Sequence, residues 1–194
     1  MSRKSNVFWA KRNIVDYIWK SARLENISVT YPQTECIYNG INVQSLNIYE
    51  VTAINNLKHG WLLVLSNLHY ETDYSLLCQT HKAVGSNLIL GAGFPRGLPV
   101  SIGGGGTSWK PDIPIESVIK DEFYDILHNT CFSITDVAMA LMLYLMRKQI
   151  FLDGNKRTAM LIANHIMIRN GRGVVTIPLR KQEEFKSKLI NFYE

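Results

Sequence analysis

Cysteine is scarce in this sequence and long hydrophobic runs are missing, which excludes several classes of protein. Among 194 residues there are three cysteines, at Cys36, Cys78 and Cys131. They are far apart and lack the spacings of zinc ligands or redox pairs, so we expect no metal or disulfide framework and instead small buried thiols. No apolar run approaches the ~20 residues that span a bilayer, so no membrane partner is predicted.

The basic start of the chain does not have the pattern of a signal peptide. An amphipathic helix pattern follows it that contains Lys11, Arg12 and Asp16, and no small-residue cleavage site is found. We therefore predict a cytoplasmic location, and the sequence leaves export as an effector open.

Acidic residues are fewer than basic ones, and the formal net charge is +5 at pH 7. The basic residues are dispersed apart from a small group near the end of the chain. Solvated helix faces explain this distribution, because few aromatic residues lie between the cations and no nucleic-acid-reading motif is present. Nucleic acid is therefore not an expected partner.

Hydrophobic periodicity predicts one mostly helical domain over residues 1–194. Apolar residues recur at the three- and four-residue spacing of a helix face in most of the chain. No internal repeat, linker or low-complexity tract divides it. Residues 27–44 are expected to form a loop. The expected helices cover residues 7–24, 45–66, 74–85, 115–129, 137–146, 158–168 and 183–193.

Glycine and proline are concentrated in one segment. Residues 91–114 contain seven of the 13 glycines and four of the six prolines. They surround an alternating strip from Leu98 to Ile102, which predicts a short irregular β-hairpin. The four glycines from Gly103 to Gly106 are expected at its tip, because no Gly-Lys-Ser/Thr follows them as in a P-loop.

Two apolar helices are expected to form the core within residues 133–170. The segment 137–146 has no charged residue, and Ser133 can cap its start. A second apolar helix follows after a polar loop at residues 149–157. A loop that joins two core helices is held rigid, as a functional loop must be.

The polar loop has the residue types of a phosphate site. A loop that enters a helix offers free backbone N–H groups and the positive end of the helix dipole, and Gly154 lets an anion approach closely. Lys156 and Arg157 add cationic donors, while Asp153 supplies a carboxylate of the kind that Mg²⁺ accepts beside phosphates. The same residues also describe a surface turn with solvated charges, and the spacing alone leaves both interpretations open.

The order of these residues resembles the signature of the Fic/Doc family, His-x-Phe-x-Asp/Glu-Gly-Asn-Gly/Lys-Arg. Six of its seven defined positions match. The resemblance extends to the helices that flank the loop and to the Gly/Pro-rich segment before them. The matching residues are Phe151, Asp153, Gly154, Asn155, Lys156 and Arg157.

The resemblance implies a mainly α fold, a Fic-type helical bundle with a short β-hairpin flap at residues 91–114 that docks the main chain of a target protein. The family moves AMP from ATP to a protein hydroxyl, and one branch, like Doc, moves phosphate. ATP and Mg²⁺ are the implied cofactors. Asp153 would hold Mg²⁺, Asn155 and Arg157 would contact the phosphates, and the backbone from Gly154 onward would form the anion hole. Homo-oligomerisation is left open.

Gln149 stands where the family has the histidine that takes the proton from the target hydroxyl. An amide does not accept a proton near neutral pH, and general-base help is typically ~10²–10⁴-fold. Efficient AMP transfer by the usual mechanism is therefore not expected. None of the five histidines is placed beside Gln149 by the sequence, and His165 is expected in the core or on the surface.

Two more positions depart from the AMP-transferring pattern. Lys156 sits where those members have Gly and where the Doc-like branch has Lys. Met160 sits where many members carry a second Arg that binds the terminal phosphate. The sequence therefore leaves three functions open: an impaired AMP transferase or nucleotide sensor, a Doc-like phosphotransferase, and a non-catalytic pseudoenzyme that binds proteins.

Residues 7–26 resemble an N-terminal inhibitory helix of this family. Its motif is Ser/Thr-x-x-x-Glu-Gly/Asn, and Ser21, Glu25 and Asn26 match it. In the family the glutamate pairs with the second Arg and obstructs the γ-phosphate. Because Met160 replaces that Arg, Glu25 is expected to turn to Arg157 or Lys156, or to be a solvated helix end.

Overall fold

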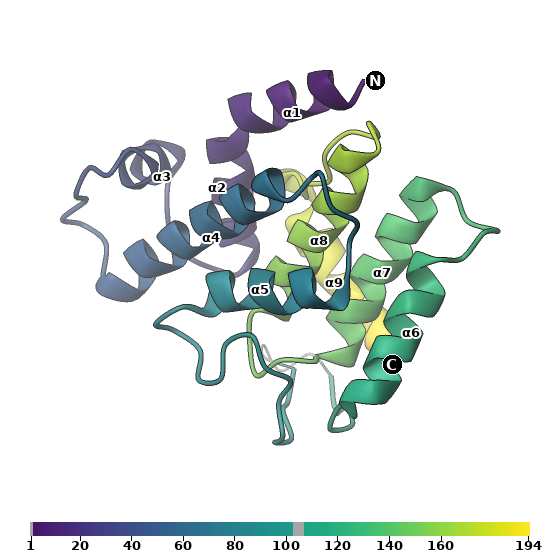
Figure 1. The fold of residues 1–194 in the computed structure, drawn as a ribbon. Coiled ribbons are helices and arrows are strands. Elements are labelled where there is room, and N and C mark those ends of the chain that lie inside the picture. Colours follow the sequence, from purple (N-terminus) through teal and green to yellow (C-terminus); the bar gives the residue numbers. More distant parts are fainter. Residues whose placement is uncertain (1, 103–106) are drawn as a thin grey trace.

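The computed structural model describes residues 2–102 and 107–194, and within these ranges the chain is helical without a single strand (Figure 1). In the same ranges no helix combines the length and the apolarity needed to cross a membrane. The elements are α1 (Arg3–Arg12), α2 (Ile14–Leu24), α3 (Tyr31–Tyr38), α4 (Ile48–Ser66), α5 (Tyr74–Gly85), α6 (Glu116–Leu127), α7 (Ile134–Lys148), α8 (Asn155–Arg169), the 3-10 turn η1 (Leu179–Lys181) and α9 (Gln182–Tyr193).

The helix expected near the N-terminus is divided into α1 and α2 at Asn13. The side chain of Asn13 donates a hydrogen bond to the carbonyl of Trp9 at 2.9 Å, and its backbone leaves the helical region with φ −108° and ψ 14°. Such side-chain bonds compete with the helix ladder. The expectation of one continuous helix is therefore wrong at this residue.

The expected loop at residues 27–44 contains the helix α3. A capping box begins it, in which the Thr30 side chain accepts from the Gln33 N–H and the Gln33 side chain accepts from the Thr30 N–H. Pro32 in the first turn fits because its missing N–H has no partner there in any helix. The sequence suggests a loop here through Pro32, Asn39-Gly40 and several β-branched residues, but a proline in the first turn and a capping box are compatible with a short helix.

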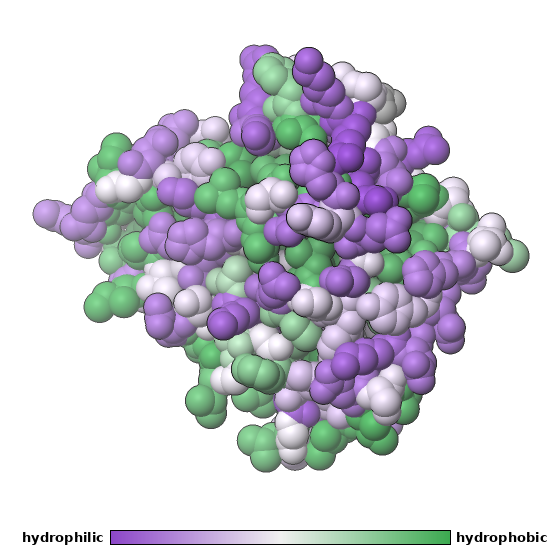
Figure 2. All heavy atoms as spheres, viewed as in Figure 1, coloured by the Kyte–Doolittle hydropathy of each residue, from purple (hydrophilic) through white to green (hydrophobic). Residues whose placement is uncertain are grey.

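The predicted β-hairpin flap is wrong for the described residues. The segment between α5 and α6 forms turns and irregular extended backbone. Prolines such as Pro99 and Pro111 lack the N–H that a strand ladder needs. The expected tip, Gly103 to Gly106, lies outside the described residues. Figure 2 shows hydrophobic residues along the lower edge of the molecule, where this segment lies in Figure 1.

The three cysteines are unbridged, and none of them is fully buried. Cys36 and Cys78 are half-buried in helices. Cys131 is exposed in the connection between α6 and α7, where few apolar neighbours are available to cover it. The expectation of three buried thiols is therefore wrong for Cys131.

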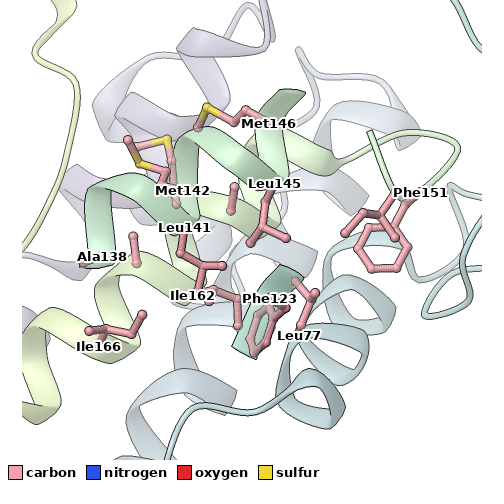
Figure 3. Close-up of a cluster of buried hydrophobic side chains, with 14 of the residues drawn as sticks. Leu77, Phe123, Ala138, Leu141, Met142, Leu145, Met146, Phe151, Ile162 and Ile166 are labelled. Atoms are coloured by element: carbon pink, nitrogen blue, oxygen red, sulfur yellow. The ribbon is translucent and has the colours of Figure 1, made fainter. Parts of the chain in front are cut away.

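The core is built around α8, which packs against α7 on one side and against α4 and α5 on others. Thirteen of its fifteen residues are buried, so its position is fixed over its whole length. Ile162 of α8 lies beside Leu141 of α7 in the larger hydrophobic cluster (Figure 3). Full burial of such side chains contributes roughly 1.5–3 kcal/mol each. The two core helices predicted within residues 133–170 correspond in position to α7 and α8.

Candidate functional site

The loop between α7 and α8 is shaped by two residues in the left-handed region. Gln149 ends α7 with φ 48°, and Gly154 precedes α8 with φ 74°. A Cβ at Gly154 would also lie 3.1 Å from Ile89 Cδ1, so glycine is favoured both by conformation and by space. Phe151 is buried between them and anchors the loop in the core. The sharp entry leaves the N-terminus of α8 open.

Asn155 ties the loop together from inside. Its Oδ1 accepts from the Phe151 N–H at 3.0 Å, and its Nδ2 donates to the Phe151 carbonyl at 2.8 Å. The same Nδ2 donates to Gln149 Oε1 at 3.1 Å. In this structure the Asn155 amide therefore supports the loop, and its expected contact with a phosphate stays a prediction.

Gln149 has both ends of its side-chain amide engaged. Its Nε2 donates to the carbonyl of Met146 at 2.5 Å, while its Oε1 accepts from Asn155. The side chain lies in the wall of a large cleft. An amide held in this way orients groups in the cleft but provides no proton acceptor of the strength of an imidazole.

His81 of α5 packs against the loop and is hydrogen-bonded to it. Its ring stacks on Phe151 with a centroid distance of 3.7 Å and an interplanar angle of 4°. Nδ1 accepts from the Gly93 N–H at 2.8 Å, which assigns the proton to Nε2 and makes Nε2 the donor to the Asp153 carbonyl at 2.9 Å. Both nitrogens are thus used, and burial lowers the pKa of His81 to about 4. This neutral histidine therefore holds the loop in place and is not available as a general base.

The stability of the protein is expected to fall as the pH drops from about 6.5 to about 4, partly through His81. The folded state holds His81 neutral with a pKa of about 4 against 6.5 for the free group, so the unfolded chain binds the proton first. The contribution of neutral His81 to the free energy of unfolding is present in full above pH 6.5. About 3 kcal/mol of it is lost as the pH falls to about 4. Urea unfolding measured across this pH range tests it.

The matched variant for this test is His81→Gln, whose amide can donate to the Asp153 carbonyl and accept from the Gly93 N–H without titrating. We expect its stability to depend less on pH than that of the parent. His165 is also buried, with a lowered pKa, so the double variant that includes His165→Gln should flatten the profile further. Equal slopes for parent and His81→Gln would contradict the assignment.

Arg96 joins the Gly/Pro-rich segment to the loop. Its side chain is 3% exposed and donates to four backbone carbonyls. Its Nε donates to the Gln149 carbonyl at 2.6 Å, and its backbone N–H donates to the Ile150 carbonyl at 2.9 Å. The backbone of this segment is therefore held to the loop by hydrogen bonds from one guanidinium and not by strand pairing. The other acceptors are the carbonyls of Leu98 at 2.7 Å, Pro111 at 3.3 Å and Asp112 at 2.6 Å.

A cleft of about 870 Å³ opens beside the loop. Its volume lies within the ~300–1,000 Å³ typical of small-molecule sites. Its walls come from the end of α2, the loop, the start of α8, the Gly/Pro-rich segment and α9. They include Glu25, Asn26, Ile102, Gln149, Leu152, Asp153, Asn155, Lys156, Lys186 and Tyr193.

Two contacts cross the cleft near the end of α2. Lys156 Nζ lies 3.2 Å from Glu25 Oε2, and Lys186 Nζ donates to Asn26 Oδ1 at 2.7 Å. Of the three alternatives for Glu25, namely Arg157, Lys156 and a solvated helix end, the structure shows the ion pair with Lys156. Because Lys156 lies in the first turn of α8, this ion pair places a carboxylate beside the helix N-terminus, where an anion would bind.

Arg157 lies behind the loop and does not line the cleft. Its side chain is 3% exposed, and its Nη2 donates to Asp153 Oδ2 at 3.2 Å. Its Nε and Nη1 are buried and have no hydrogen-bond partner within the described part of the chain. They belong to a small cavity of about 10 Å³ that is also lined by Ser21 and Met160. Contact with a phosphate in the cleft therefore requires Arg157 to change its rotamer.

The last helix closes one side of the cleft. Tyr193 is buried and stacks on Trp109 with a centroid distance of 5.5 Å. Arg147 Nη2 donates to the Tyr193 carbonyl at 3.0 Å. Burial raises the pKa of Tyr193, the Glu25 carboxylate adds to this, and the Gln149 side chain acts in the opposite direction. The Tyr193 phenol is therefore a neutral hydrogen-bonding group beside Gln149.

The residues present fit a Mg²⁺ ion that is carried by a nucleotide. In residues 2–102 and 107–194 no three His, Cys, Asp or Glu side chains gather into a metal site. Asp153 lines the cleft as a carboxylate whose side chain is 64% exposed. Mg²⁺ usually binds to one or two carboxylates together with phosphates and water, so one accessible carboxylate suffices in a nucleotide complex.

Comparison with known proteins agrees with this geometry. A sequence profile of the Fic/DOC family matches residues 71–167. Fic-1 of C. elegans (residues 134–508) superimposes with a TM-score of 0.79 at 21% identity, covering 93% of this chain and 56% of that one. A Fic domain containing signaling protein of Bacteroides thetaiotaomicron gives a TM-score of 0.81 at 17% identity, covering 93% and 72%. Among functionally curated proteins no sequence matches.

A Fic family protein of Desulfovibrio desulfuricans also shares the fold, with a TM-score of 0.73 at 16% identity over 94% of this chain and 55% of that one. The helical fold with a phosphate-type loop between its core helices defines a Fic-type domain. This chain belongs to the Fic/DOC family. The family generally binds a nucleoside triphosphate with a metal and transfers a nucleoside monophosphate to proteins. The chain spans little more than half of the solved Fic-1 chain, residues 134–508.

The structure brings together most of the residues that the sequence singled out. The residues on the cleft wall are Gln149, Asp153, Asn155, Lys156, Glu25 and Asn26. Arg157 and Ser21 lie at the small cavity behind the loop. Gly154 shapes the loop through its left-handed backbone. Three residues were missed: His81, Arg96 and Tyr193. A signal existed for His81, which lies on the buried face of α5 four residues after Leu77.

Proposed function

We propose that this protein binds ATP with Mg²⁺ in the cleft and that its transfer of AMP to a protein hydroxyl is slow, because Gln149 provides no general base. The observation that carries the proposal is the amide of Gln149 in the cleft wall, engaged at both ends, next to an otherwise complete phosphate loop. Nucleotide sensing is the function that remains when transfer is slow.

The phosphate site is supported by the start of α8. The first backbone N–H groups of a helix have no partner within the helix, and here they open onto the cleft through Asn155 and Lys156. Lys156 adds a cation at the same place. Asp153 would hold Mg²⁺, which neutralises phosphate charge when bound. Arg157 would join the phosphates after turning out of its small cavity.

The ion pair between Glu25 and Lys156 supports a regulatory role of α2. A triphosphate that enters the cleft competes with the Glu25 carboxylate for Lys156 and meets like charge. The pair is partly exposed, and such pairs contribute on the order of 0.2–1 kcal/mol. We therefore propose inhibition of nucleotide binding by Glu25 that is weaker than inhibition through a buried Arg.

The proposed partner is a target protein whose main chain docks at the Gly/Pro-rich segment. Ser101 and Ile102 of this segment line the cleft, and Phe94 and Leu98 are exposed nearby in sequence. Arg96 holds this segment next to the Gln149 carbonyl, so a docked chain would be positioned near Gln149. Backbone polar groups that no strand ladder uses are available for such docking.

Calorimetric titration with ATP and Mg²⁺ tests the nucleotide site. We expect the parent to bind, Lys156→Ala and Arg157→Ala to bind at least about tenfold more weakly because each loses a charge-assisted phosphate contact, and Glu25→Gly to bind a few-fold more tightly. Asp153→Asn should weaken binding with Mg²⁺ but not without it. Lys188→Ala, outside the cleft lining, is the control.

Failure of both the parent and Glu25→Gly to bind ATP would contradict the proposal and favour a protein-interaction function without nucleotide. A second enzymatic function, phosphate transfer as in Doc, is favoured by Lys156 in the loop. Incubation with ATP labelled at the α- or the γ-phosphate separates the two: α-label on protein indicates AMP transfer, and γ-label indicates phosphate transfer.

A further inference from the structure

The N-terminal helix α1 exposes its large aromatic side chains to solvent and buries a polar and a small residue against the domain. It buries Asn6 and Ala10, while Phe8 is 58% and Trp9 is 44% exposed. A surface helix normally turns its large apolar side chains to the core. Phe8 instead faces outward, and Trp9, 100° further round the helix, lies on its flank and contacts Phe8 edge to face at a centroid distance of 5.6 Å.

The attachment of α1 to the domain explains why this orientation is stable. With its amide oxygen turned to the end of α8, Asn6 accepts hydrogen bonds from the backbone N–H groups of Gly173 at 2.8 Å and Arg172 at 3.0 Å. Ala10 is small enough to allow close contact with α8. Asn6, Ala10 and the partly buried Val7 thus attach the helix to the domain, and Phe8 and Trp9 remain largely exposed.

Cations surround the exposed rings. At 100° per residue, Phe8 lies at the centre of the outward face, with Lys4 and Arg12 about 40° to either side and Lys11 beside Lys4. All three cations are exposed, and none forms an ion pair within the described ranges of the chain. The Arg12 guanidinium lies 5.3 Å from the centroid of the Trp9 ring. The helix contains no acidic residue.

We propose that the outward face of α1 is a docking surface for an anionic phospholipid membrane. Clusters of four or more Lys and Arg side chains on a surface helix attract anionic lipid headgroups, and α1 carries four exposed cations around the exposed Phe8. Helix α1 lies at the edge of the molecule (Figure 1), where Figure 2 shows hydrophobic and hydrophilic residues side by side. Attachment of this kind needs no spanning helix.

A second surface feature agrees with this orientation. Arg3 donates a hydrogen bond to the carbonyl of Leu68, which brings the start of α1 beside the turn that carries the exposed Tyr70. None of the residues of the α1 face lines the nucleotide cleft. The proposed membrane surface is therefore independent of the proposed nucleotide site, and each can fail without the other.

Sedimentation with vesicles tests the proposal on the full chain. We expect binding to phosphatidylcholine vesicles in which about a third of the lipid is phosphatidylserine, little binding to pure phosphatidylcholine, and weakening by salt. Lys4→Glu with Arg12→Glu should lower partitioning by more than about a hundredfold, at about fivefold for each unit of charge. The matched control is Lys110→Glu with Arg180→Glu, which changes the net charge equally at exposed positions elsewhere.

Depth of insertion is measured by quenching of tryptophan fluorescence with brominated lipids. Quenching in the parent that is lost in Trp9→Phe supports the proposal, and Phe8→Ser with Trp9→Ser should lower partitioning while leaving the circular dichroism unchanged. No binding of the parent to anionic vesicles would overturn it, as would an equal loss in the control pair. So would a change of oligomeric state in Phe8→Ser with Trp9→Ser without any effect on vesicle binding, since the face would then be a contact between copies.

Discussion

Replacement of Gln149 by histidine, together with Glu25→Gly, is expected to raise the transfer of AMP onto protein by about 10²–10⁴-fold over the parent. The imidazole supplies the proton acceptor that the amide lacks. Histidine also tolerates the left-handed conformation at this position, where φ is 48°. The measurement is incorporation of α-labelled phosphate into the protein itself.

The position of residue 149 is fixed mainly through its backbone, which is why the substitution should work. Arg96 holds the carbonyl of residue 149 at 2.6 Å, and this bond does not depend on the side chain. The bond from Gln149 Nε2 to the Met146 carbonyl is lost, at a cost of about 1 kcal/mol. The new ring would still lie in the cleft wall beside Asn155.

Two controls separate a gained base from a general opening of the cleft. Gln149→Leu with Glu25→Gly removes the amide and the Glu25 carboxylate but adds no base, so it should stay at the parental level. Adding Asp153→Asn to the histidine variant should abolish the gain if Asp153 holds Mg²⁺. Histidine and leucine variants of equal activity would show that more than the base is missing.

Arg96→Met is expected to destabilise the protein by roughly 3–5 kcal/mol. Four backbone carbonyls accept hydrogen bonds from this buried guanidinium, and bonds to charged groups contribute about 1.5–3 kcal/mol each before water compensates part of the loss. For a chain of this length the midpoint of thermal unfolding should fall by about 10 °C or more. Equilibrium unfolding in urea measures the free energy directly.

Arg96→Lys distinguishes the role of the charge from that of the fork geometry. A lysine keeps the charge but presents a single ammonium that cannot reach the four acceptors. We therefore expect the free energy of unfolding of Arg96→Lys to lie between that of the parent and that of Arg96→Met. Arg180→Met, at an exposed position, should change stability by less than about 0.5 kcal/mol. If Arg96→Met were as stable as Arg180→Met, the proposed link between the Gly/Pro-rich segment and the loop would not exist.

The effect of Arg96→Met should also reach the nucleotide site without a direct contact. The arginine supports the Gln149 carbonyl, and its backbone supports the Ile150 carbonyl, so its loss frees the start of the loop. Faster hydrogen exchange at residues 150–154, measured under conditions where the variant remains folded, would report this. Unchanged exchange there would mean that Arg96 stabilises only its own segment.

The sequence by itself determined the helical class, the two core helices and the loop between them. These features depend on local signals: an uncharged apolar segment before the loop, the capping residue Ser133 with Asp136, and Gly154 at a place that requires a left-handed backbone. The matched motif residues also identified the family. Helix periodicity and capping act over a few residues and can therefore be read along the chain.

Only the tertiary structure decided what lies around the loop. The link from Arg96 to Gln149 spans 53 residues and that from His81 to Asp153 spans 72, so neither has a local pattern. The choice of Lys156 as the partner of Glu25 likewise follows from how α2 meets α8. The hairpin failed for a related reason: alternation in sequence predicts a strand only if the backbone can pair, and the prolines removed the donors that such pairing requires.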